Sequence, residues 1–112
     1  MVKYIPKQKD VVLVDFDPAK GHEQKGYRPG IVISTDTFNK FTNMAIVLPI
    51  TSNDKEFPTH YKLINTKKVS GSVLCEHVKS IDYEDRKVKF VETLSDEDFL
   101  SIYTLFVACL ED

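Results

Sequence analysis

Short runs of β-branched and apolar residues dominate the chain, and each run is interrupted within a few residues by proline, glycine or a polar turn. Such runs between turn signals are typical of strands, since β-branched side chains pack well on a pleated surface. We expect strands at residues 10–16, 30–34, 44–50, 60–64 and 87–91, and one strand bent near Glu76 that contains 72–75 and 78–81.

The C-terminal segment changes to a helical period. Ser95 is a favourable N-cap, and the acidic residues that follow it suit the positive end of the helix dipole. Many short strands with one terminal helix predict a mainly β chain folded as a small, strongly bent barrel. The apolar stripe of the helix is broad, which fits either packing against the barrel alone or burial of the surplus in a homodimer interface. The stripe consists of Phe99, Leu100, Ile102, Tyr103, Phe106, Val107 and Leu110.

The length of 112 residues is that of a single domain, which we expect to span residues 1–112. No run of about 18 apolar residues is present, and the N-terminal segment lacks the apolar stretch and cleavage site of a signal peptide. Cys75 and Cys109 lie in apolar runs without a partner at metal-binding spacing, so we expect two buried thiols. These features predict a cytoplasmic protein.

Charge is unevenly distributed along the chain. The formal net charge is -2, but from Glu92 onward there are six acidic residues and no basic ones. The other 91 residues carry 15 bases against 11 acids. A mildly basic body is compatible with an anionic ligand, although solvated charged faces produce the same pattern.

The segment from Gly21 to Pro29 concentrates polar and reactive side chains. Cleavage of RNA through its ribose 2′-hydroxyl needs a proton acceptor, a proton donor and a group that stabilises charge on the phosphorane. Arg28 suits the last role because its planar fork pairs with two phosphate oxygens. A charged surface loop without chemistry has the same composition, so the pattern alone leaves both interpretations open. The side chains concerned are His22, Glu23, Gln24, Lys25, Tyr27 and Arg28.

Two hydroxyls and three imidazoles complete the set of candidate groups. The run Pro49-Ile50-Thr51-Ser52 places both hydroxyls directly after an apolar stretch, which suits phosphate binding, although both residues are also ordinary turn formers. A pair of histidines is an alternative acid and base for RNA cleavage. His60 and His77 lie in or beside expected strands, where a structural role is the simpler interpretation, whereas His22 lies in the polar loop.

Several segments, in a fixed order, carry a family resemblance. They are Asp15-Phe16-Asp17-Pro18, then Gly21-x-Glu23-Gln24-x-Gly26-x-Arg28-Pro29 leading into Ile31-Val32-Ile33-Ser34, then Pro49-Ile50-Thr51-Ser52, Pro58-Thr59-His60 and Val78-Lys79-Ser80-Ile81-Asp82. Together they span most of the chain and resemble the MazF/PemK toxins of type II toxin–antitoxin systems. The long stretch that ends in Arg28-Pro29 is the most specific of these segments.

The resemblance implies a fold, an activity and partners. The fold would be an SH3-like barrel with a C-terminal helix, the MazF/CcdB-like toxin fold, assembled as a homodimer. The activity would be that of an mRNA interferase, a sequence-selective endoribonuclease that cleaves single-stranded RNA without metal or cofactor and leaves 2′,3′-cyclic phosphate and 5′-hydroxyl ends. A cognate MazE-like antitoxin would occupy the RNA groove through a flexible acidic segment.

The resemblance also assigns roles to individual residues. Arg28 and Thr51 match the two central active-site positions of the family, and Glu23 matches a motif position beside the substrate groove. Many relatives have glutamine where this chain has His77, so contacts with the RNA bases are expected to differ there. The candidate substrate-binding residues are His22, Gln24, Lys25, Tyr27, Ser52 and His77.

Two other functions remain open at this point. One is a non-enzymatic gyrase poison like those of the related CcdB family, and the other is an inactive barrel that only binds a partner. Arg28 and Thr51 argue against both, because neither function needs that pair. A metal enzyme is not expected, since no His/Cys cluster has zinc-like spacing and the acidic residues are scattered.

Overall fold

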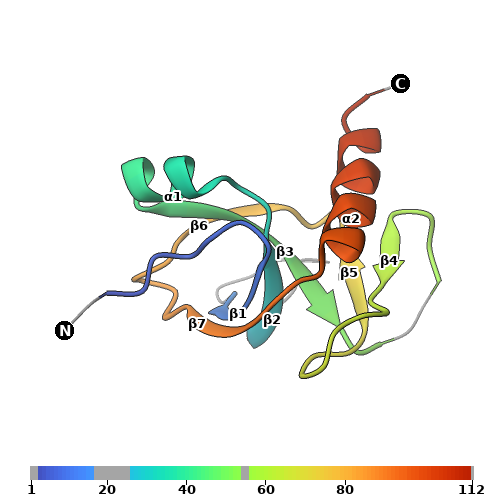
Figure 1. The fold of residues 1–112 in the computed structure, drawn as a ribbon, viewed down its shortest axis with the longest axis horizontal. Helices are drawn as coiled ribbons and strands as arrows, with labels where there is room; N and C mark the ends of the chain where they lie inside the picture. The colour runs from blue at the N-terminus through green and yellow to red at the C-terminus, as the bar shows by residue number, and fades with distance from the viewer. Residues whose placement is uncertain (1–2, 17–25, 54–55, 112) are drawn as a thin grey trace.

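The computed structural model describes residues 3–16, 26–53 and 56–111, which form a β-sheet and two helices (Figure 1). The strands expected from the β-branched runs are present, with ends shifted by a few residues. The terminal helix begins as predicted, since the Ser95 hydroxyl accepts a hydrogen bond from the Asp98 N–H at 3.1 Å. No helix of the described ranges is long and apolar enough to cross a membrane. The elements are β1 (Asp10–Asp15), β2 (Tyr27–Val32), α1 (Asp36–Thr42), β3 (Met44–Thr51), β4 (His60–Lys62), β5 (Ser72–Leu74), β6 (Lys79–Asp82), β7 (Lys89–Thr93) and α2 (Asp96–Ala108).

Strand β3 is the centre of an antiparallel sheet. The strands follow the order β4-β5-β3-β2-β1-β7, and β6 also pairs with β3. Within the described residues β4 and β7 do not pair with each other, so the expected barrel is not closed. Two other contacts involve these edge strands. Helix α2 stands beside β4 (Figure 1), and the Glu92 side chain of β7 reaches the loop 67–69 that joins β4 to β5.

Residues 72–82 run along β3 as two strands. In the first, Val73 pairs with Ile50, and in the second, Lys79 pairs with Val47. Between these two pairs β3 advances three residues while its partner advances six, so the segment around Glu76 leaves the ladder. The bend predicted near Glu76 is therefore a break between β5 and β6.

Apolar clusters lie on both faces of the sheet. Because side chains alternate along a strand, Val11 and Val12 of β1 point to opposite faces and join different clusters. The first cluster packs beneath α2, whose Ile102 is fully buried. This packing does not use the whole helical stripe, since Leu100 and Leu110 are 67% and 68% exposed.

A buried carboxylate ties α2 to β4. Asp98 is fully buried, and its oxygens accept hydrogen bonds from the Tyr61 hydroxyl at 2.6 Å and from the Asn65 N–H at 3.0 Å. Burial and the bond to Asp98 raise the pKa of Tyr61 to about 12. The phenol therefore stays protonated at neutral pH and keeps donating to the carboxylate.

Helix α1 is a feature that the sequence pattern does not predict. Its seven residues are too few to show a helical period, and its buried side chain is the polar Asn39. The helix is set by its ends. The Thr35 hydroxyl accepts from the Phe38 N–H at 3.2 Å, and Asn43 closes the helix in the left-handed conformation.

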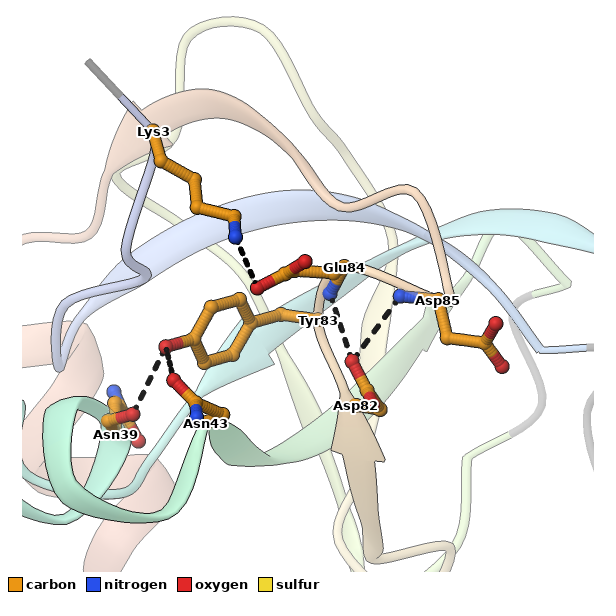
Figure 2. Close-up of polar contacts among 7 residues, drawn as sticks. All are labelled: Lys3, Asn39, Asn43, Asp82, Tyr83, Glu84 and Asp85. Carbon is orange, nitrogen blue, oxygen red and sulfur yellow. Dashed lines mark hydrogen bonds and ion pairs between the residues drawn. The ribbon is translucent and has the colours of Figure 1, made fainter.

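The turn after β6 is held against α1 (Figure 2). The Tyr83 hydroxyl donates to the Asn39 carbonyl oxygen at 3.1 Å. One carboxylate oxygen of Asp82 accepts from the N–H groups of Glu84 and Asp85, both at 3.1 Å. These bonds fix the path of the chain from β6 towards β7, where basic residues follow directly.

The two cysteines differ in exposure. Cys75 is buried as expected, and its burial raises the pKa of the thiol to about 12, which makes it unreactive at neutral pH. The expectation for Cys109 is wrong, because this residue is exposed. The reason is that α2 extends past the sheet at its C-terminal end (Figure 1).

The side chain of Glu92 caps the loop between β4 and β5. Its carboxylate accepts hydrogen bonds from the backbone N–H groups of Lys67, Lys68 and Val69 at 3.0, 2.8 and 3.0 Å. Partial burial alone would raise the pKa of Glu92, but the three bonds outweigh it and hold the pKa below its usual value.

We expect Glu92→Gln to lower the free energy of unfolding by about 1 kcal/mol at neutral pH, because an amide accepts through one oxygen and carries no charge. Since the folded-state pKa is depressed, the contribution is present above the ordinary pKa of 4.5 and is lost as the pH falls through the folded value. Urea unfolding at pH 7 and at pH 3 checks both points. Glu111→Gln, at an exposed site, is the control, and an equal loss at both pH values would contradict the capping role.

Candidate functional site

Arg28 and Thr51 come from neighbouring strands of the sheet. In the β2–β3 ladder Gly30 pairs with Pro49. The ladder ends at this pair, and Arg28 and Thr51 each lie two residues beyond it, at neighbouring ends of β2 and β3. Because side chains alternate along a strand, Arg28 shares the face of Gly30 and Thr51 shares the face of Pro49. The fold thus places together two residues that are distant in the sequence.

Thr51 is held in a defined orientation. It is buried at the end of β3, and its hydroxyl oxygen accepts from the Asn53 N–H at 3.1 Å. This contact starts a turn, as the turn-forming character of the segment predicts. A hydroxyl that accepts in this way still has a proton to donate. The turn therefore orients a group that can bind a phosphate oxygen.

Gly71 packs against the backbone at Thr51. Its φ is +127°, and a Cβ atom added there would lie 2.2 Å from the Thr51 carbonyl oxygen and 3.3 Å from the Ser52 Cα. Glycine is required at such a position, because no side chain fits. The Ser70-Gly71-Ser72 run signals a turn in the sequence, but nothing in it shows which strand the turn contacts.

The side chains on the same face as Thr51 continue in a row across β5 to β4, at the edge of the sheet. Thr51 pairs with Ser72 of β5, and Ser72 pairs with Lys62 of β4. The buried Ser72 and the exposed Lys62 therefore share a face with the pair Arg28 and Thr51. Two cations and two hydroxyls in one row favour an anionic ligand. No sequence motif marks Ser72 or Lys62 as a site residue.

Tyr27 lies on the other side of β2 from Arg28, since successive side chains of a strand alternate. It pairs with Asp15 of β1, and its hydroxyl donates to the Lys87 carbonyl oxygen at 3.1 Å. The ring is 46% exposed. The structure therefore separates Tyr27 from the face that carries Arg28 and Thr51.

His60 and His77 meet at Glu76, in the break between β5 and β6. The Glu76 carboxylate accepts from the Thr59 hydroxyl at 2.8 Å and bonds His60 Nε2 at 2.8 Å, while His77 Nε2 lies 3.7 Å away. Partial burial would raise the pKa of Glu76, but these hydrogen bonds and one from its own backbone N–H lower it. His60 is therefore hydrogen-bonded within the fold, in keeping with the structural interpretation.

Four of the selected residues, His22, Glu23, Gln24 and Lys25, lie outside the described residues. Ser52 follows Thr51 directly and is exposed. Across the three described ranges, no group of three or more His, Cys, Asp or Glu side chains is placed to hold a metal ion. The described part of the candidate site thus consists of a guanidinium and an oriented hydroxyl at neighbouring strand ends, two groups that can neutralise and hold a phosphate group.

Comparison with known proteins gives consistent matches along the chain. A family model described as PemK-like, MazF-like toxin of type II toxin–antitoxin system matches residues 7–108. The endoribonuclease toxin MazF of Escherichia coli strain K12 is 35% identical over 96 residues, which cover 86% of each chain. The endoribonuclease toxin ChpB of the same strain is 38% identical over 96 residues, with 79% of each chain covered.

Solved structures agree with these matches. The chain superimposes on MazF of Deinococcus radiodurans with a TM-score of 0.91 and 30% sequence identity, covering 96% of this chain and 98% of that one. A MazE–MazF structure from the same organism gives a TM-score of 0.83 at 25% identity, with 96% and 97% covered. The open, helix-backed sheet described above is thus shared along nearly its whole length.

Proposed function

This chain belongs to the PemK/MazF family of toxins of type II toxin–antitoxin systems, and we propose that it is an endoribonuclease that cleaves single-stranded RNA. Identity of 35% with the endoribonuclease toxin MazF of Escherichia coli supports the reaction class. The observation that supports the proposal is that Arg28 and Thr51 lie at neighbouring ends of the paired strands β2 and β3. A gyrase poison or a binding-only barrel would have no use for that pair.

In the proposed reaction the ribose 2′-hydroxyl attacks the adjacent phosphorus. The bond from phosphorus to the 5′ oxygen breaks, which leaves a 2′,3′-cyclic phosphate and a 5′-hydroxyl end. Arg28 neutralises charge on the phosphorane through two N–H donors, so its guanidinium supplies the charge that a metal ion would otherwise provide. Thr51 orients the phosphate through its hydroxyl.

The proton from the 2′-hydroxyl needs an acceptor other than Arg28. A guanidinium keeps its protons at neutral pH, so it is a poor base. We assign this role to the carboxylate of Glu23, which matches a motif position of the family near the substrate groove. The leaving 5′ oxygen takes up a proton from Arg28 or from water. No metal or cofactor enters this scheme.

The remaining assignments concern binding. We propose a homodimer, because Leu100 of α2 and Leu110 just beyond its end leave apolar surface for a second copy. The MazE–MazF structures of relatives support a cognate antitoxin as partner. We propose that residues 1–112 form one domain. Since the proposed substrate is cellular RNA, we also propose that the protein acts in the cytoplasm. Nucleotide contacts are proposed for His22, Gln24, Lys25, Tyr27, Ser52 and His77.

The proposal is tested by incubating the chain with a long single-stranded RNA in EDTA. We expect cuts at one recurrent short sequence, with cyclic phosphate and 5′-hydroxyl ends, which mapping by primer extension and end labelling detects. The same preparation is assayed for inhibition of gyrase supercoiling. Intact RNA together with blocked supercoiling would refute the endoribonuclease and favour a gyrase poison, and intact RNA with active gyrase would favour a binding-only barrel.

A further inference from the structure

A second cluster of cations lies where the β1–β2 ladder ends, at the pair Asp15–Tyr27, on the other face of β2 from Arg28. There the turn that follows β6 is fastened to the hairpin. The Asp15 N–H donates to the Arg86 carbonyl oxygen at 3.0 Å, and the Tyr27 hydroxyl donates to the Lys87 carbonyl oxygen at 3.1 Å. Lys87 itself has a φ of +53°, an uncommon conformation for a residue with a side chain. These two hydrogen bonds at the end of the ladder thus hold Lys87 beside Tyr27.

These residues surround a shallow hollow of about 420 Å³. Among the described residues its lining consists of Asp15, Tyr27, Lys87 and Lys89, and these four carry one net positive charge. The two lysines and the tyrosine ring are exposed, so a ligand can reach them. The hollow is therefore an accessible, mildly basic site with an aromatic wall.

The acidic residues of the same turn face elsewhere (Figure 2). Asp82 accepts two backbone N–H groups, and Glu84 pairs with Lys3. With Asn43 and Asp85 they line a separate hollow. The turn thus separates its charges, with acids beside α1 and bases beside the hairpin, so the lysines keep their attraction for anions.

The chemistry of the lining fits one nucleotide of a single strand. An exposed aromatic ring stacks on a base, and ammonium groups attract the phosphates on either side. A carboxylate among them would repel a bare phosphate, but it can accept a hydrogen bond from a base amino group or a ribose 2′-hydroxyl. Asp15 therefore favours a nucleotide over an inorganic anion.

We propose that Tyr27, Lys87 and Lys89 form an accessory subsite for a nucleotide that flanks the cleaved phosphate. Tyr27 and Arg28 are adjacent in β2 and point to opposite faces, so an RNA strand that occupies both sites must cross from one face of β2 to the other. The inference rests on the proposed endoribonuclease function. It predicts that RNA extended on one side of the cut binds more tightly than a minimal RNA.

Binding is measured with RNAs that carry a 2′-deoxy nucleotide at the mapped cut site, which removes the attacking hydroxyl. A minimal RNA is compared with versions extended on the 5′ or the 3′ side. We expect one extension to improve the dissociation constant by tenfold or more. The ratio of the dissociation constant for minimal RNA to that for extended RNA should fall about tenfold in Tyr27→Ala, because a stacked base is lost. In Lys87→Ala/Lys89→Ala, binding of extended RNA should depend less on salt. The slope of the logarithm of the binding constant against the logarithm of salt concentration should be smaller by about 0.7 per lysine.

Two controls separate the subsite from general effects. Lys40→Ala/Lys67→Ala removes two exposed lysines elsewhere and should keep the wild-type ratio, while Tyr27→Phe keeps the ring and should retain most of it. A ratio unchanged in all variants, or equal losses on minimal and extended RNA, would overturn the subsite while cleavage by the wild type persists. A wild-type chain that cuts no RNA would instead remove the proposed function, and the subsite with it.

Discussion

Arg28→Lys is expected to lower the single-turnover rate of RNA cleavage by about 10² to 10³-fold, the usual cost of removing a group that stabilises transition-state charge. Lysine keeps the positive charge but loses the planar fork that pairs with two phosphate oxygens. The dissociation constant for uncleavable RNA should therefore change by no more than about threefold. Rapid-quench measurements with excess enzyme separate the chemical step from binding.

Glu23→Gln is the matched comparison, because it removes a carboxylate without changing its size. If Glu23 accepts the 2′-hydroxyl proton, the rate should fall about 10²-fold and the rise of the rate with pH should disappear. A wild-type rate would remove Glu23 from the scheme, and a near-normal rate for Arg28→Lys would contradict phosphorane stabilisation by a bidentate guanidinium. Both variants should unfold at the wild-type urea concentration.

Local patterns predict most elements of this fold. The β-branched runs mark β1 and β3 because strands buried on both faces of a sheet select such side chains. Ser95 marks the start of α2 because its hydroxyl accepts a backbone N–H. Helix α1 escapes prediction because its buried residue, Asn39, is polar and bonds to the Pro6 carbonyl oxygen at 2.8 Å. That partner lies far away in the sequence, so no local pattern shows it.

The site is predictable in its residue types and not in its grouping. Arg28 and Thr51 stand out by their chemistry, but their shared face follows from the β2–β3 register, which is a long-range property of the sheet. The same register excludes Tyr27 from that face although it adjoins Arg28 in the sequence. Ser72 and Lys62 join the row only through β5 and β4, strands of three residues each whose pairing no local signal reveals.

Gly71→Ala is expected to have the largest effect on stability, with a loss of about 3 kcal/mol in the free energy of unfolding. The added methyl group would lie 2.2 Å from the Thr51 carbonyl oxygen, which is backbone and cannot rotate away. Either loop 70–72 or the end of β3 must move. Urea unfolding measures the loss, and single-turnover cleavage at a temperature where the variant stays folded measures the displacement of Thr51.

Gly26→Ala isolates the contribution of backbone conformation to this loss. Gly26 also has a positive φ, +79°, but an added Cβ meets no atom of the described residues within 4 Å, so its loss should be about 1 kcal/mol. The difference between the two variants is then the steric clash at Thr51. If Gly71→Ala cleaves RNA at the wild-type rate while folded, Thr51 does not need the orientation that the loop imposes. If the two variants lose equal stability, the segment around Gly71 yields without strain, and the contact at Gly71 does not hold the end of β3 that carries Thr51 in place.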